Sequence, residues 1–292
     1  MPELPEVETT VRGLQKKLVG LRFVDVWADR DKPFRQAGGT AALRKAVVGK
    51  KILKVWRRAK FIVIDVEGPQ SLFIHQKISG HLLYGKLILE NGVWRSTARG
   101  PIRDDPKNKH LRFVFSLNNG YQLAMSDVRR FANVILINDD SVGKLKEISK
   151  LGPEPLDISF SDFKKLFEKK RGRVKQVLMD PFFIVGIGNI YADEILWTVG
   201  LHPLSRVEHL SEADIQHVYA AMKKILQKSI ELKGSSLDDY RTPSGEKGSY
   251  QNVHKAYHRT GQPCLKKDGG IMTRMVIGGR SAHFCPVHQV VK

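Results

Sequence analysis

Short apolar runs of strand length follow one another between residues 60 and 138, and they constrain the fold more than any other feature. The clearest is Lys60-Phe-Ile-Val-Ile-Asp-Val66, which is rich in β-branched residues. Further strands are predicted over 71–75, 82–89, 110–117, 121–126 and 132–138, with a tight hairpin at Asn118-Asn119-Gly120. Because no helical segment separates these runs, they predict an antiparallel sandwich.

Helical spacing of apolar residues flanks this β-rich stretch on both sides. Helices are predicted over 5–18 before it and over 161–170, 188–199 and 211–232 after it, the last one capped by Ser211 with Asp214 three places on. The predicted fold class is therefore α+β. We expect an N-terminal β-sandwich domain with flanking helices (1–148), a helical domain (149–249) and a C-terminal β-hairpin finger (250–292).

The charge of the chain predicts a polyanionic partner. The 292 residues include 49 Lys and Arg against 30 Asp and Glu, a net charge of +19, which concentrates nucleic acid near a protein surface. A protein that is basic for solubility, or that binds an acidic protein, is the alternative.

No run approaches the ~20 apolar residues of a membrane span. No secretory signal is expected, and two cysteines make no disulfide framework, so we expect a cytoplasmic protein, nucleoid-associated if bacterial.

The chain opens with the unusual segment Met1-Pro-Glu-Leu-Pro-Glu-Val-Glu8. Removal of Met1 would leave Pro2 with a secondary amine, and an α-amino group with a pKa of ~8 is partly neutral near pH 7. Such an amine can attack a sugar C1′ and form an iminium, with Glu3 as general acid. The alternative is that Pro2 and Pro5 simply begin a helix.

Ordered motifs along the whole chain resemble formamidopyrimidine-DNA glycosylase of the Fpg/Nei family. The opening octapeptide is similar to the opening of that family. The other similar segments are Arg57-Arg-Ala-Lys-Phe61, His75-Gln-Lys-Ile-Ser-Gly80, Asp127-Val-Arg-Arg-Phe131, Leu151-Gly-Pro-Glu-Pro155, Gly186-Ile-Gly-Asn-Ile-Tyr-Ala-Asp-Glu194 (a helix–two-turn–helix motif) and Gly278-Gly-Arg-Ser-Ala-His-Phe-Cys285.

The resemblance implies a bifunctional enzyme that excises 8-oxoguanine and formamidopyrimidines from duplex DNA and then cleaves the strand by β,δ-elimination. Pro2 is the implied nucleophile and Glu3 the general acid. Glu6 would orient the sugar or a water, and Lys60 would assist proton transfer. Without the resemblance, the sequence favours a strand lysine at position 60 whose charged head reaches water.

The resemblance also implies the residues that contact DNA. An enzyme that extracts a base must fill the hole it leaves, and Ile78, Arg129 and Phe131 occupy the family's filling positions, with Ile78 replacing a methionine. Without the resemblance, Phe131 is equally consistent with a buried residue of the strand core. The remaining implied contacts are His75, Asn189, Tyr191 and Arg280, and Lys77 and His81 are expected to add phosphate contacts.

The loop Thr242–Tyr250 resembles the family segment that closes over a flipped 8-oxoguanine. Its glycines fit a mobile lid, although a plain connector is the alternative. The implied lesion-contacting residues are Gly245, Lys247, Gly248, Ser249 and Tyr250. Ala132 and His258 stand where the family usually has glycine.

The finger departs from the usual four cysteines of the family. Cys264, Cys285 and His288 are competent zinc ligands, but Lys267 occupies the position of an expected cysteine and has no lone pair to offer when protonated. Asp268 or His283 is the candidate fourth ligand. A finger without zinc is the alternative.

Two rival functions share the same basic composition. One is an endonuclease VIII-like glycosylase for oxidised pyrimidines, against which Leu4 and the lid-like loop argue. The other is a non-catalytic binder of damaged DNA, against which the intact set of four implied catalytic residues argues. The expected partner is double-stranded DNA with a damaged base, bound by a monomer in a basic cleft, with no organic cofactor.

Overall fold

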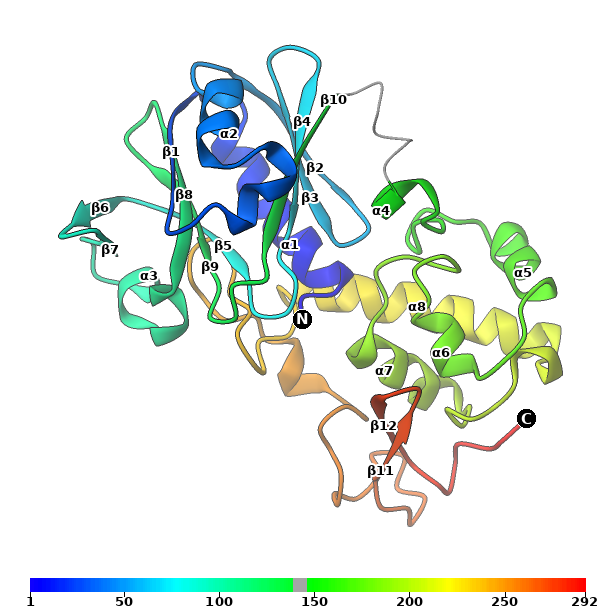
Figure 1. Ribbon diagram of the computed structural model, residues 1–292. Coiled ribbons are helices and arrows are strands. Elements are labelled where there is room, and N and C mark those ends of the chain that lie inside the picture. Colours follow the sequence, from blue (N-terminus) through cyan, green and yellow to red (C-terminus); the bar gives the residue numbers. More distant parts are fainter. Residues whose placement is uncertain (139–145) are drawn as a thin grey trace. The chain divides into compact units, whose positions relative to one another are not determined.

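The computed structural model describes residues 1–138 and 146–292, which group into two compact units (Figure 1). The first unit contains the described part of Met1–Ser149 together with Leu232–Ser249, and the second contains Lys150–Glu231 and Tyr250–Lys292. Residues 232–249, expected in the helical domain, thus pack with the sandwich. In the described part of the chain, no helix is long and apolar enough to cross a bilayer.

Helix α1 (Leu4–Leu18) begins at a reciprocal capping box between Glu3 and Glu6, with Pro5 in its first turn. These features explain why the helix begins directly after the first three residues. Its apolar side chains recur at helical spacing and are buried in the core of the first unit: Val7, Val11, Leu14 and Leu18.

The first unit is an antiparallel β-sandwich of two four-stranded sheets, as predicted (Figure 1). One sheet has the order β1-β8-β9-β5, formed by Phe23–Ala28, Leu111–Leu117, Gln122–Ser126 and His81–Gly85. The other has the order β10-β4-β3-β2, formed by Asn133–Asn138, Gln70–His75, Phe61–Val66 and Ile52–Arg58. Apolar residues of both sheets share one buried cluster with α1.

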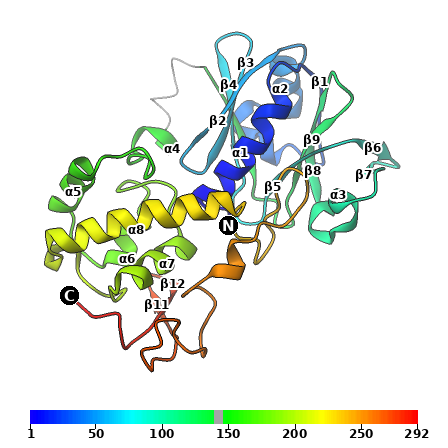
Figure 2. The ribbon, with the colours of Figure 1, turned by 180° about the vertical axis from the view of Figure 1, so that it is seen from behind.

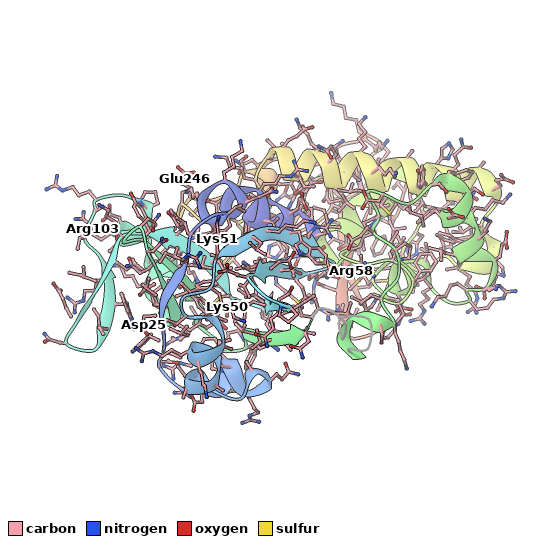
Figure 3. The ribbon with its side chains drawn as sticks, turned by 90° about the horizontal axis from the view of Figure 1, so that it is seen from above. Asp25, Lys50, Lys51, Arg58, Arg103 and Glu246 are labelled. Carbon is pink, nitrogen blue, oxygen red and sulfur yellow. The ribbon has the colours of Figure 1, made fainter. Side chains whose placement is uncertain are left out.

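Several elements of the first unit were not predicted from the sequence. These are β1, β2, the helix α2 (Thr40–Val47) and the turn η1 (Lys32–Ala37). Figure 3 labels Lys50 and Lys51, which precede β2, and Arg58, its last residue. Because basic residues interrupt the apolar pattern of β2, its strand signal is weak in the sequence.

A connection between β5 and β8 carries its own small elements. A hairpin of β6 (Leu87–Glu90) and β7 (Val93–Ser96) is followed by the short helix α3 (Pro101–Asp104) and the turn η2 (Pro106–Lys109). The predicted strand 82–89 is thus divided into β5 and β6. Trp94 of β7 packs edge-on against Trp27 of β1, which attaches the hairpin to the sandwich.

The second unit is helical, as predicted. Figure 2 shows its longest helix, α8 (Glu212–Glu231), which packs against α7 (Asn189–Val199). The amide of Asp214 donates to Ser211 Oγ at 3.2 Å and that of Ser211 to Asp214 Oδ2 at 2.9 Å, so the predicted cap of α8 is confirmed. The smaller helical elements are α4 (Lys146–Ser149, in the first unit), α5 (Phe160–Glu168), α6 (Val174–Leu178), η4 (Val207–His209) and η5 (Tyr250–Val253).

The C-terminal finger is a hairpin of β11 (Thr273–Ile277) and β12 (Arg280–Phe284), joined by the two glycines Gly278 and Gly279. It belongs to the second unit. The predicted hairpin is therefore confirmed, and its tip presents Arg280 to solvent.

Candidate functional site

The first turn of the chain buries two carboxylates beside Pro2. The side chains of Glu3 and Glu6 are only 3% and 2% exposed, and Pro2 is buried as well. The amide of Glu3 donates to Glu6 Oε2 at 2.9 Å. The other carboxylate oxygen of Glu6 accepts the amide of Ser235 at 2.7 Å. Both oxygens of Glu6 are thus held by backbone donors, which fixes this side chain in one orientation.

The segment that follows α8 forms the cradle for Glu6. A Cβ at Gly234 would lie 2.9 Å from Glu6 Oε1, so only glycine allows this approach without a shift of the carboxylate. Tyr240 is buried beside it, and burial together with the Glu6 carboxylate raises the pKa of this phenol above its ordinary value. These contacts explain why Leu232–Ser249 belongs to the first unit.

Lys60 lies in the two-residue turn between β2 and β3. Ala59, the other turn residue, has a φ of 53° and its carbonyl accepts from Arg57 Nη1 at 3.2 Å. Arg57 also donates through Nε to Glu8 Oε2 of α1 at 2.8 Å, and these side chains are 8% and 17% exposed. The Arg57 and Arg12 guanidiniums lower the pKa of Glu8 against the opposing effect of its burial. This ion pair ties the turn that carries Lys60 to the helix that carries Glu6.

His75 ends β4 next to the same turn, because it pairs in register with Phe61. Its ring lies edge-on to Phe61 at 4.8 Å, and its Nδ1 accepts the amide of Lys77 at 2.9 Å. Burial, reinforced by the charges of Lys77 and Lys60, lowers the pKa of His75 to about 3. His75 is therefore a neutral hydrogen-bonding group near pH 7.

Asp127 organises the two loops that carry the predicted base-replacing residues. Its buried carboxylate accepts the amides of Phe131 at 2.7 Å, of Ala132 at 2.8 Å and of Arg129 at 3.2 Å. It also accepts the hydroxyl of Ser79, which lies on the preceding loop. One carboxylate thus fixes both loops.

The side chains displayed by these loops are exposed despite being large. Ile78 is 38% and Phe131 43% exposed, and Arg129 stacks over the ring of Phe131 at 5.0 Å. Phe131 is therefore not strand core, which was the alternative for it. The two loops fixed by Asp127 thus carry Ile78, Arg129 and Phe131 with their side chains exposed at the surface.

The loop between Asp239 and Ser249 is closed by its own hydrogen bonds. The amide of Gly245 donates to Thr242 O at 2.8 Å and that of Thr242 to Glu246 O at 2.9 Å. The amide of Gly248 donates to Ser236 Oγ at 2.9 Å. Gly245 and Gly248 are buried, whereas Lys247 is exposed and Ser249 half-buried.

Tyr191 and Tyr250, which were assigned to DNA contact and lesion contact, are buried in the second unit. Tyr250 does not belong to the loop: it is 4% exposed, lies in the second unit and packs on Tyr191 at 5.5 Å. Tyr191 is itself fully buried, with its hydroxyl 2.6 Å from Ser229 Oγ. Both rings pack α7, α8 and η5 together, and their assignments as contact residues stay predictions.

His81 was also assigned as a phosphate contact. It is 1% exposed, and its Nε2 lies 2.9 Å from Asn108 Oδ1. Burial lowers the pKa of His81 to about 4, so it is a neutral donor to this amide oxygen. Lys77 is half-buried, with a φ of 55°.

In the second unit, Asn189 and the finger tip lie together. Asn189 begins α7, and its Nδ2 donates to Ser281 Oγ at 3.2 Å, next to the exposed Arg280. Below them, the buried Lys175 donates to Asp193 Oδ1 at 2.6 Å and to Ser281 O at 2.5 Å. A helix N-terminus and an arginine side by side suit a phosphate.

Four residues of the finger form a candidate metal centre. Donor atoms of Cys264, Asp268, Cys285 and His288 all lie within 4.8 Å of one another. His288 Nε2 donates to Trp197 O at 3.0 Å, which leaves Nδ1 as the ring nitrogen that faces Asp268 and Cys264. Zinc ligands commonly have this second hydrogen bond. His283, the other candidate ligand, instead faces Asp193 through Nδ1 at 2.9 Å, so it is not part of the cluster.

Three residues that shape the site were not singled out from the sequence. They are Asp127, Gly234 and Glu8, the last of which pairs with Arg57. Asp127 stood inside a recognised segment, so a buried acid before a turn was a usable signal. The roles of Glu8 and Gly234 depend on partners 49 and 228 positions away and have no local signal.

Comparison with known proteins is consistent along the full chain. The model of the formamidopyrimidine-DNA glycosylase N-terminal domain matches residues 1–134, and that of the formamidopyrimidine-DNA glycosylase H2TH domain matches residues 151–241. A formamidopyrimidine-DNA glycosylase of Pelotomaculum thermopropionicum is 36% identical over 100% of both chains. That of Herpetosiphon aurantiacus is 34% identical over 99% of this chain and 100% of the relative.

Solved structures of Lactococcus lactis Fpg are similar to this chain. Its complex with an abasic-site-containing DNA superposes with a TM-score of 0.84 at 31% identity, covering 99% of each chain. The complex of the wild-type protein with an N7-benzyl-Fapy-dG-containing DNA gives the same TM-score and coverage.

Proposed function

The chain belongs to the formamidopyrimidine-DNA glycosylase family, and we propose that it excises oxidised purines from duplex DNA and cleaves the strand at the resulting abasic site. The observation that carries the proposal is the pair of buried, backbone-held carboxylates, Glu3 and Glu6, beside Pro2. Their arrangement provides an acid and an orienting carboxylate next to the nitrogen of Pro2. The basic composition of the chain suits duplex DNA as the substrate.

The proposed reaction requires removal of Met1, which frees the nitrogen of Pro2. The lone pair of this amine attacks C1′ of the damaged nucleoside while the bond from C1′ to the base breaks and the base leaves with a proton. Glu3 protonates the sugar ring oxygen as the ring opens, which yields the iminium. Loss of the 3′-phosphate by β-elimination and of the 5′-phosphate by δ-elimination then leaves a one-nucleotide gap.

Lys60 and Glu6 have supporting parts in this proposal. Lys60, on the turn tied to α1 through Arg57 and Glu8, assists proton transfer and contacts the DNA. Glu6 orients the sugar or a water through a carboxylate that cannot rotate. His75, neutral near pH 7 and with Nδ1 occupied by the amide of Lys77, donates through Nε2 to the DNA backbone.

Base extraction is assigned to the exposed side chains of the loops that Asp127 fixes. Ile78 and Phe131 enter the base stack, and Arg129 pairs with the orphaned cytosine. Gly245, Lys247, Gly248 and Ser249 of the hydrogen-bonded loop contact the extruded purine. In the second unit, Asn189 and Arg280 bind phosphates.

We further propose that the finger binds zinc through Cys264, Asp268, Cys285 and His288. The four donor atoms, two of them sulfur, suit a closed tetrahedral site, although a carboxylate ligand is unusual there. Bound zinc would stabilise the finger and so the position of Arg280 within it. It takes no part in the chemistry.

Strand cleavage of three matched duplexes tests the function. Each carries one 8-oxoguanine, one abasic site or one oxidised pyrimidine opposite its normal partner. We expect cleavage of the first two, and with Glu3→Gln a loss of 8-oxoguanine excision. Preference for the pyrimidine would favour the endonuclease VIII-like alternative. Binding without cleavage of any duplex would contradict the catalytic proposal.

A further inference from the structure

A short segment of the first unit forms ion pairs and a hydrogen bond with the predicted lesion loop. This segment, Pro101–Lys109, comprises α3 and η2 and follows the β6–β7 hairpin; we call it the clamp segment. We propose that the clamp segment keeps the loop Asp239–Ser249 preformed in the absence of DNA and thereby determines how well the protein retains an extruded base. The proposal rests on the proposed function, because it assigns the loop to lesion contact.

Two ion pairs join the clamp segment to the base of the loop. Arg241 Nε donates to Asp105 Oδ2 at 2.6 Å, with side chains 4% and 17% exposed. Lys107 Nζ donates to Asp239 Oδ1 at 2.6 Å, with side chains 41% and 20% exposed. Since the first pair is largely shielded from water, it is expected to be the stronger. The Arg241 guanidinium counteracts the burial of Asp105 and lowers the pKa of that carboxyl.

A buried amide joins the clamp segment to the tip of the loop. Asn108 is 2% exposed, and its Nδ2 donates to Gly245 O at 3.0 Å and to Pro101 O at 2.8 Å. Gly245 has a φ of 82°, and a Cβ there would lie 2.7 Å from Asn108 Nδ2 and 2.8 Å from Ile102 N. The loop tip therefore fits against the clamp segment only with glycine at this position.

The same segment is bonded to residues that adjoin both loops fixed by Asp127. Asn108 Oδ1 accepts His81 Nε2 at 2.9 Å, and His81 lies directly after the loop that carries Ile78. Ser126, which precedes Asp127, donates through Oγ to Lys107 O at 2.6 Å. The clamp segment thus connects the residues that would replace the base to those that would hold it.

Two pairs of neighbouring variants test this role. Asp105→Asn and Lys107→Met each weaken one ion pair to the loop. Asp104→Asn and Lys109→Met make the same changes on exposed neighbours that have no hydrogen bond or ion pair to the loop among the described contacts. Figure 3 labels Arg103, the partner of Asp104, and Glu246 of the loop.

Hydrogen exchange of the loop amides in the DNA-free protein is the first readout. We expect residues 242–248 to be protected in the native sequence and to exchange about tenfold faster in Asp105→Asn, because the negative charge that strengthens the hydrogen bond from Arg241 is lost. Lys107→Met should have a smaller effect, and both control variants should behave as the native sequence. Loop amides that exchange like an unstructured peptide in the native protein would overturn the proposal, as would unchanged protection in Asp105→Asn.

The second readout is the ratio of 8-oxoguanine excision to cleavage at a preformed abasic site. An abasic site has no base for the loop to retain, so a positioning role predicts that Asp105→Asn lowers excision about tenfold and leaves abasic cleavage within about twofold. An equal fall in both would indicate general destabilisation and overturn the proposal. If the native protein excises no oxidised purine, the proposed function fails, and hydrogen exchange alone then decides whether the clamp segment holds the loop.

Discussion

The functional residues of the amino-terminal site and those of the C-terminal finger are brought together in different ways. At the amino-terminus, Glu3 and Glu6 are three positions apart on one helical turn, and local helix geometry brings them together. In the finger, Cys264 and Cys285 are separated by 21 positions, and a hairpin and two turns must fold before the four donor atoms meet. The first arrangement follows from the local sequence, whereas the second depends on tertiary packing.

The two sites also differ in how closely they keep the residues of the family motif. The amino-terminal motif is complete: the Glu3 carboxylate accepts the amide of Glu6 in the capping box, and the Glu6 carboxylate accepts the amides of Glu3 and Ser235. In the finger, Lys267 replaces an expected cysteine, and the adjacent Asp268 joins the cluster instead. A site formed by tertiary packing can recruit a neighbouring donor, whereas one turn of a helix leaves no such freedom. Substitutions at the two sites and around them test this contrast.

Glu3→Gln should lower 8-oxoguanine excision by about 10²- to 10⁴-fold, because the amide cannot donate a proton to the opening sugar. The capping box of α1 can persist with glutamine, so the structure should be retained. Single-turnover excision measures the effect, and circular dichroism checks the fold. Excision within a few-fold of the native rate would remove Glu3 from the mechanism.

Asp268→Asn should weaken zinc binding by at least about a hundredfold, since a charged ligand is lost. Lys267→Ala, at the exposed neighbouring position, should leave the zinc affinity unchanged. Competition with a chromophoric chelator measures both affinities. Equal affinities of the two variants would show that Asp268 is not a ligand, and the absence of stoichiometric zinc in the native protein would favour the finger without metal.

The first unit should lose stability as the pH falls below about 6.5. Burial lowers the pKa of His75 to about 3 and of His81 to about 4. The unfolded chain then binds more protons than the folded one between pH 6.5 and about 4, at up to about 1.4 kcal/mol per pH unit for each histidine. Below pH 4 the contribution of His81 should level off.

Denaturant-dependent hydrogen exchange of β4 and β5 at pH 7 and pH 5 measures this loss. His81→Gln, which retains a donor for Asn108, should make the dependence shallower. An unchanged slope in this variant would show that His81 is not the titrating group.

Ile78→Met should change 8-oxoguanine excision by no more than about twofold, because the two side chains have similar volume and the position is exposed. Ile78→Ala, which shortens the side chain, should lower excision more than abasic cleavage. Parallel measurement of the two substrates separates these outcomes. A larger effect of methionine than of alanine would contradict a simple space-filling role.

Periodic and local features of this protein could be predicted from its sequence. The helix α1, the cap of α8 and the hairpin of β8 and β9 follow from apolar spacing, capping residues and a turn sequence. What the sequence did not reveal depends on distant partners. Tyr191 and Tyr250 pack on each other, and residues 232–249 join the sandwich because Glu6 and Asp105 receive their donors from that segment. Such pairings have no signature in a single sequence.

Borohydride trapping tests the central claim, that the amine of Pro2 attacks the damaged nucleoside. Two proteins should be compared on a duplex with one 8-oxoguanine opposite cytosine: one with Pro2 exposed by removal of an N-terminal tag, and one with the tag retained, so that the same nitrogen lies in a peptide bond. We expect a covalent adduct only with the exposed amine, and peptide mapping should locate it on Pro2. Equal trapping of the tagged protein, or an adduct on Lys60, would contradict it.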